Sequence, residues 1–143
     1  MQTRIVTLRA SAEIATATTQ NGTAVKLQRK YSELVAVLDA TAVATDADDT
    51  LNVYIDTSFD GGTSWVNIGH FTEILGNGGA KKFIMSFKAN PIAASNSVPF
   101  GSDQSAAAAL QIGFGDRIRY RAVTVDPTGA NIAITYSVTA FLQ

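Results

Sequence analysis

Three groups of side chains in the sequence have the types and spacing that chemistry needs. His70 is the only histidine, so a Ser-His-Asp triad can be written on paper, whereas a metal site with two histidine ligands within one chain is excluded. No nucleophile elbow, P-loop or dinucleotide fingerprint accompanies the histidine. We therefore interpret His70 as an ordinary sheet residue beside Phe71. We predict that the protein is not an enzyme and uses no cofactor or metal.

The second group places three carboxylates in one loop, at Asp46, Asp48 and Asp49. Carboxylate oxygens are calcium ligands in proteins. The loop lacks the glycine and the distal glutamate of an EF-hand, and carboxylates gather readily on solvated turns. A solvated loop is the favoured interpretation, and the sequence leaves open whether this loop binds a cation.

The third group is a basic stripe, Arg117, Arg119 and Arg121, whose spacing of two places all three on one face of a strand. One interpretation is an anionic partner, and the other is a solvated face that blocks edge-to-edge aggregation. A net charge of −1 creates no global positive field, and there is no aromatic interleaving of the kind that stacks bases. Because arginine is enriched at protein interfaces, we predict that the stripe contacts a protein and not nucleic acid.

The elements that position these residues are predicted to be strands. Apolar and polar residues alternate in 50–58, 116–125 and 132–142, which is typical of half-buried antiparallel strands. Weaker strand patterns are read from 4–9, 13–18, 24–27, 33–41, 64–71 and 81–88. The spacing predicts one all-β domain over residues 1–143, with residues 1–10 as a candidate contact arm. The expected fold is an antiparallel, jelly-roll-like sandwich of about eight strands.

Connecting segments carry specific turn chemistry. Gln20-Asn-Gly-Thr23 predicts a tight hairpin, and Asp126-Pro-Thr-Gly129 predicts the turn before the last strand. The long connection 89–115 is expected to be irregular and functional, with a short capped helix after Ser102. Ser58-Phe-Asp60-Gly-Gly62-Thr-Ser-Trp65 matches the Asp-box pattern of sialidase propellers and many other β proteins. One copy cannot build a propeller, so we interpret it as a hairpin brace rather than a sugar site.

The composition excludes several classes of protein. The chain has 143 residues, of which 46% are apolar and 16% charged, which suits one folded domain and argues against disorder. The absence of cysteine excludes a disulfide scaffold, a thiolate zinc site and a cysteine nucleophile. There is no signal-peptide pattern and no apolar stretch near the roughly 20 residues of a membrane helix. We expect a protein made in the cytoplasm that does not bind membranes.

Two blocks of the sequence carry a resemblance to a known group of proteins. The first runs from Leu51 through Ser-Phe-Asp-Gly-Gly-Thr-Ser-Trp to Ile-Gly-His-Phe71, and the second is Gly115-Asp-Arg-Ile-Arg-Tyr-Arg121. Together with the final alternating strand, they resemble small structural proteins of tailed bacteriophages. Capsid decoration (head-stabilising) proteins are the closest match in size. The resemblance covers the chain from Thr50 to its end, and its motifs are structural.

The resemblance implies a role and a partner. A decoration protein is a non-enzymatic virion component that binds the outer surface of an assembled capsid and stabilises it. The implied partner is the major capsid protein, and a homotrimer is the favoured oligomer. The alternative is a small glycan- or host-surface-binding module of a tail or fibre. Apolar anchors carry most interface energy, so we predict contacts through Ile92, Val98 and Phe100 of the long loop, with the arginine stripe setting orientation.

Overall fold

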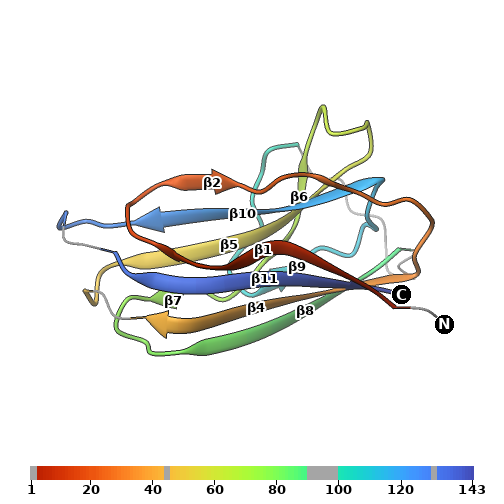
Figure 1. Ribbon diagram of the computed structural model, residues 1–143. Coiled ribbons are helices and arrows are strands. Elements are labelled where there is room, and N and C mark those ends of the chain that lie inside the picture. The colour runs from red at the N-terminus through yellow and green to blue at the C-terminus, as the bar shows by residue number, and fades with distance from the viewer. Residues whose placement is uncertain (1–2, 44–45, 90–99, 130–131) are drawn as a thin grey trace.

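The chain folds into two antiparallel sheets that pack against each other (Figure 1). The computed structural model describes residues 3–43, 46–89, 100–129 and 132–143. The four strands of sheet A are, in spatial order, β1 (Arg4–Ile14), β11 (Ile134–Leu142), β4 (Glu33–Val43) and β8 (Lys81–Lys88). The main order of sheet B is β2 (Thr19–Asn21), β10 (Arg117–Val125), β5 (Thr50–Ser58), β6 (Val66–His70) and β9 (Ala108–Ala109). Two short strands complete sheet B, with β3 (Val25–Lys26) paired to β10 and β7 (Ile74–Leu75) paired to β5.

This strand order is that of a jelly roll. If β2 and β3 count as one interrupted strand and the two-residue strands β7 and β9 are set aside, eight strands remain. Their order is first, eighth, third and sixth in sheet A, and second, seventh, fourth and fifth in sheet B. The predicted antiparallel sandwich is confirmed. The strand number is corrected to eleven within the described residues, because one strand is interrupted and two short ladders are added.

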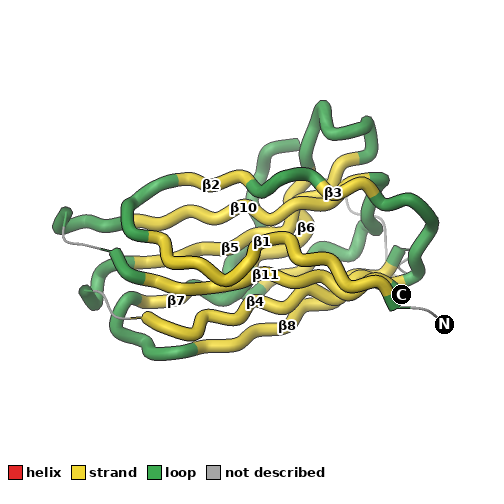
Figure 2. The backbone as a smooth tube through the Cα atoms, viewed as in Figure 1, coloured by secondary structure: helices red, strands yellow, loops and turns green. Residues whose placement is uncertain are grey.

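The hydrophobic core lies between the sheets, as the alternation predicted. In β11, Ile134, Tyr136 and Val138 are all fully buried, whereas the residues between them are half-exposed. In sheet B, Ile118 and Ala122 of β10 are fully buried in the same way. Figure 2 shows only strands and loops among the described residues. Accordingly, the described residues contain no helix that could cross a membrane. Residues 4–10 belong to β1 and are paired with β11 in sheet A.

The predicted hairpin at Asn21-Gly22 is wrong. Both β2 and β3 pair with β10, so the chain continues along the same edge of sheet B instead of reversing. The Gly22 amide donates to the Tyr120 carbonyl oxygen at 2.9 Å. A Cβ at Gly22 would lie 2.3 Å from Tyr120 Cδ1, so glycine is needed here for close approach to the ring. The predicted turn at 126–129 is confirmed, because the Gly129 amide donates to Asp126 Oδ1 and Gly129 has a φ of 73°.

The expected short helix after Ser102 is also wrong. Ala107 has a left-handed φ of 62°, and the Ala108 amide closes a turn by donating to the Ser105 carbonyl oxygen. The chain then forms β9, and the Leu110 amide donates to the Ile68 carbonyl oxygen. Pairing with β6 therefore prevails over the helix propensity of the alanine run, because it adds long-range hydrogen bonds that a local helix would lack.

Candidate functional site

A buried ion-pair centre lies on the outer face of sheet B, where β10 and β5 are neighbours. Asp56 is 2% exposed, and its Oδ2 is 3.3 Å from Nε of both Arg119 and Arg121. Asn67 Nδ2 donates to Asp56 Oδ1 at 3.0 Å, so both carboxylate oxygens are satisfied. The Arg119 and Arg121 side chains are 19% and 17% exposed, so neither is a solvated surface group.

Aromatic rings complete the packing of these two arginines. The Arg119 guanidinium carbon lies 4.1 Å from the centre of the Trp65 ring, and that of Arg121 lies 4.1 Å from the Tyr54 ring. Tyr54 in turn stacks on His70 with 4.2 Å between ring centres. Each arginine is thus held by a carboxylate at one side and an aromatic face at the other, which fixes its position within the fold.

The segment after Phe100 is fastened over this centre. Asp103 pairs with the Arg121 guanidinium, and the Gln104 amide donates to Asn67 Oδ1 at 2.8 Å. Burial alone lowers the pKa of Arg121, but the charges of Asp56 and Asp103 outweigh it and raise this pKa. The arginine therefore stays cationic and clamps the loop to the sheet.

His70 belongs to β6, as predicted, and its ring is built into the same network. Its Nδ1 is 2.9 Å from the Gln104 carbonyl oxygen, and its Nε2 is 2.7 Å from Asn52 Oδ1. The Asn52 side chain donates to Glu73 Oε2 at 2.8 Å. Nδ1 therefore contacts the loop and Nε2 contacts β5, and neither nitrogen is directed at a serine hydroxyl of the described residues.

The Asp-box turn is a brace, as the sequence predicted. Asp60 Oδ1 accepts hydrogen bonds from the Ser64 amide and the Ser58 hydroxyl, each at 2.8 Å. These bonds, led by the one from the Ser64 amide, hold the pKa of Asp60 below its usual value. The Gly62 amide, with a φ of 96°, donates to Ser58 Oγ. Arg117, the third arginine of the stripe, lies against Gly62, so the turn also supports the end of β10.

The three carboxylates of the acidic loop lie in different settings. Asp46 and Asp48 are exposed, whereas Asp49 is fully buried. Neither carboxylate oxygen of Asp49 has a hydrogen-bond partner in the described part of the chain. No cluster of three or more histidine or acidic side chains among the described residues is arranged to hold a metal ion.

The outer face of sheet A presents an apolar surface. Cross-strand pairing joins Ile5 of β1 to Phe141 of β11, and Phe141 to Val35 of β4. In the next row, Val37 of β4 is paired with Ile84 of β8. Ile5 is 65% exposed and Ile84 is 73% exposed, while the adjacent Val6, Phe83 and Met85 belong to the core or pack against it. We call these five residues the sheet A patch.

The sheet A patch has charged pairs at both ends. Glu33 of β4 is paired in register with Lys88 of β8, and Asp39 of β4 forms an ion pair with Lys82 of β8, with 2.8 Å between Oδ2 and Nζ. An apolar centre with a polar rim is the usual anatomy of a protein interface. The patch was not predicted, although the valines at alternate positions of 33–41 were a visible signal.

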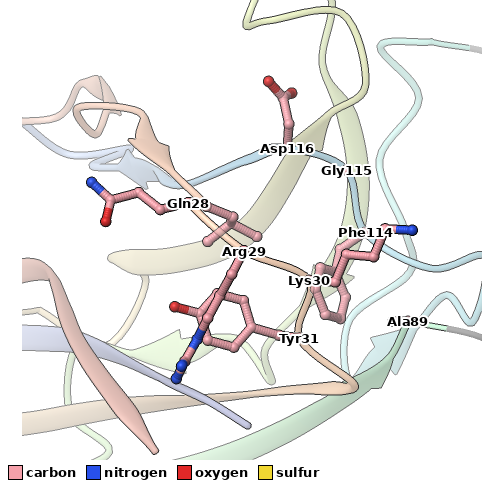
Figure 3. Close-up of a pocket in the computed structure, with 9 residues that line it drawn as sticks. Gln28, Arg29, Lys30, Tyr31, Ala89, Phe114, Gly115 and Asp116 are labelled. Carbon is pink, nitrogen blue, oxygen red and sulfur yellow. The ribbon is translucent and has the colours of Figure 1, made fainter.

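The described surface also contains a cavity of about 510 Å³ (Figure 3). It is formed by the connection from β3 to β4 together with the segment that leads into β10. Its lining residues are Leu27, Gln28, Arg29, Lys30, Tyr31, Ala89, Phe114, Gly115 and Asp116. A second hollow of about 350 Å³ shares Gln28, Arg29 and Tyr31 and adds Thr3 and Arg4. We call the two together the Tyr31 cleft.

The structure places the predicted interface residues in different settings. Arg117, Arg119 and Arg121 do share one face of β10, but two of them are committed to Asp56. Phe100 is 62% exposed. The predicted anchors Ile92 and Val98 lie outside the described residues. Whether any of these residues contacts a partner stays a prediction.

Sequence reasoning missed Asp56, which is the centre of the network around the stripe. The sequence shows only that Asp56 lies on the polar face of β5, whose other face is apolar. That signal does not say which strand lies beside it, and only the pairing of β5 with β10 brings it to the arginines.

Comparison with known proteins completes the description of the chain. No protein-family model, curated protein or solved structure matches it.

Proposed function

We propose that this protein is a non-enzymatic structural component of a phage virion, which binds the outer surface of an assembled capsid and stabilises it. The sequence resemblance to capsid decoration proteins supports this role. The jelly roll is compatible with it, since that fold occurs in viral capsid and lectin domains alike, and fold alone does not decide function. The major capsid protein is the partner.

The single observation that carries the proposal is the sheet A patch. Ile5 and Ile84 expose large apolar side chains, and Phe141, Val35 and Val37 connect them across four strands. Contiguous apolar surface of this kind on a soluble protein marks an interaction site. A rigid sheet face also suits a repeated lattice, because it is already in its bound conformation and loses little entropy on binding.

Phe100 provides a second anchor for the proposed assembly. It directly precedes Gly101, which lines a hollow together with Asp56 and Arg119 of sheet B, whereas the patch belongs to sheet A. A protein with apolar surfaces on both sides can contact the shell with one and a second copy with the other. We propose that the sheet A patch contacts the shell and that Phe100 lies in a homotrimer interface.

Co-sedimentation with undecorated capsid shells tests the proposal. The double variant Ile5→Ser/Ile84→Ser should retain the fold, because both side chains are mostly exposed. Removing two interface isoleucines should weaken shell binding by about tenfold or more, at low and high salt alike. The matched control is Val125→Ser, which removes a 45% exposed apolar side chain from the end of β10 in sheet B.

Other measurements separate the alternatives. Mass spectrometry of separated heads and tails should find the protein on heads in hundreds of copies, and light scattering should give a trimer. Undiminished shell binding by the double variant would refute the role of the patch. A glycan array positive for a defined sugar, with the protein found on tails, would favour the host-surface-binding alternative instead.

A further inference from the structure

The outer edge of β8 is open along part of its length. Strand order places β8 at the end of sheet A, beside β4, and no described strand lies on its other side (Figure 1). An edge strand presents a row of backbone N–H and C=O groups, which is a template for a strand of another chain. The edge of β8 is also regular, because its register with β4 runs from Lys81 to Lys88 without a shift.

Two hydrogen bonds show which residues of β8 direct their backbone groups outward. The Ala89 amide donates to the carbonyl oxygen of Ser32, the residue before β4, at 2.9 Å. The Lys88 amide instead donates to Gln111 Oε1 at 3.3 Å, on the outer side. In an antiparallel ladder the N–H and C=O of one residue point to the same side, and the side alternates along the strand. The even-numbered residues of β8 therefore direct these groups away from β4.

The Gln111 side chain closes the second half of this edge. Besides accepting from Lys88, its amide nitrogen donates to the Ser86 carbonyl oxygen at 3.1 Å. One side-chain amide thus takes the place of a strand opposite residues 86–88. No described residue does the same for Lys82 and Ile84, so the open half of the edge covers residues 81–85.

A second copy of this chain does not fit the open half. Antiparallel pairing of two β8 strands about Ile84 would place Lys82 of one copy opposite Ser86 of the other, where Gln111 already lies. Pairing about Lys82 would place two lysines opposite each other, which is destabilising. The other edge strands are also poor partners, because β1 has two register shifts, and β2 and β9 are only three and two residues long.

The side chains at the open half indicate which strand fits. Ile84 is 73% exposed and belongs to the sheet A patch, so an apolar residue opposite it would extend the patch by one strand. The Lys82 side chain is 66% exposed and lies on the same face, paired with Asp39 of β4. An acidic residue opposite Lys82 would give this lysine a second counter-charge. Because Ile84 belongs to both surfaces, a strand on this edge and a shell against the patch form one interface.

We infer that an extended segment of the major capsid protein adds to β8 as a fifth strand of sheet A. An apolar residue of the segment lies opposite Ile84, and an acidic residue lies opposite Lys82. The inference rests on the proposed function in taking the capsid protein as the partner. It adds a backbone contact to the contact that the sheet A patch makes with its side chains. In strand addition, main-chain hydrogen bonds provide affinity, and side chains at alternate positions provide specificity.

Proline at position 84 tests the inference by co-sedimentation with undecorated shells. The Ile84 amide points away from β4, and proline is tolerated in an edge strand when its missing N–H faces outward. Ile84→Pro should therefore keep sheet A while it removes a donor and obstructs the edge. The matched control is Ile84→Ala, which also loses the apolar side chain but keeps the amide. We expect Ile84→Pro to bind shells at least about tenfold more weakly than Ile84→Ala does.

Amide hydrogen exchange of the parent protein gives a second readout that needs no variant. Shells should slow exchange at the Lys82 and Ile84 amides, because both become hydrogen-bonded to the added strand. The amides of β2, an edge strand of the other sheet, should exchange as before. Contact through the side chains of the patch alone would provide no acceptor for the two β8 amides.

Equal shell binding by Ile84→Pro and Ile84→Ala, with both melting like the parent, would overturn the inference. Unchanged exchange at the Lys82 and Ile84 amides would overturn it as well. If Ile84→Pro melts well below the parent, the exchange result alone decides. Exchange that slows with rising protein concentration in the absence of shells would assign the edge to a second copy, which also overturns the inference.

Sedimentation of the parent separates this inference from the proposed function. If the parent does not sediment with shells, the capsid role falls and the inference falls with it. If the parent sediments and Ile5→Ser/Ile84→Ser does not, while exchange at the two β8 amides is unchanged, the capsid role stands and only the edge inference falls.

Discussion

The ion-pair centre on sheet B makes a quantitative prediction about stability through Asp56→Asn. The amide keeps the shape of the side chain but removes the negative charge that faces Arg119 and Arg121 at 3.3 Å. It also places an amide where the carboxylate now accepts from both guanidinium groups. Two cations then lie close together on β10 without a counter-charge from β5.

The expected cost follows from burial. Removing one partner of a fully buried ion pair costs about 3–5 kcal/mol. The two arginine side chains keep 19% and 17% exposure, so water offsets part of the loss, and we expect about 2–4 kcal/mol. For a chain of this size, the melting temperature should fall by about 6–12 °C.

Urea unfolding followed by Trp65 fluorescence measures this loss, and the same residue reports local change because Arg119 stacks on its ring. Asp103→Asn is the matched control, because its 43% exposed carboxylate pairs with the same Arg121. That control should lose only about 0–1 kcal/mol. If Asp56→Asn costs less than about 1 kcal/mol, or no more than the control does, the centre contributes little and the reasoning fails.

Three further predictions concern other parts of the fold. Burial raises the pKa of Tyr136 to about 12. The folded state therefore holds this proton more tightly than the unfolded state, whose tyrosine pKa is about 10. The free energy of unfolding should not change through this group below pH 10, and it should fall by up to about 1.4 kcal/mol per pH unit between about pH 10 and 12. In Tyr136→Phe, the urea midpoint should lack this part of the fall. Gly115→Ala should lower the free energy of unfolding by about 3 kcal/mol or more, because the new Cβ would lie 1.9 Å from the Ser58 carbonyl oxygen. The control Gly61→Ala should lower it by only about 1–2 kcal/mol, because nothing lies within 4 Å of the new Cβ and only the positive φ is unfavourable. Phe100→Ala should change the free energy of unfolding by less than about 0.5 kcal/mol, and a weaker trimer by light scattering, insensitive to salt, would show its contact role.

The predictions that held depend on local chemistry. Alternation in 132–142 identified β11 and its buried residues, because the side chains of a strand point alternately to its two faces. The turns at Ser58–Trp65 and Asp126–Gly129 were predicted because their hydrogen bonds join residues within four positions of each other. No distant part of the chain is needed to form them.

The predictions that failed depend on pairing between distant segments. The Asn21-Gly22 pair has hairpin chemistry, but β10 offers pairing partners on both sides of it, and the chain runs on. The alanine run after Ser105 has helix propensity, but Gln104 is held by Asn67, and β9 by β6. In each case hydrogen bonds formed across the fold prevail over a weak local preference.

The sequence by itself determined that this chain is a β-sandwich with braced turns, because period-two patterning and turn chemistry are properties of neighbouring residues. Tertiary structure decided everything that joins strands far apart along the chain. It brought Asp56 to the arginine stripe, and it placed Arg4 and Tyr31 around one hollow. Alternation tells which face of a strand a side chain occupies, but the neighbour on that face is set by strand order, which emerges only when the two sheets bury their common core.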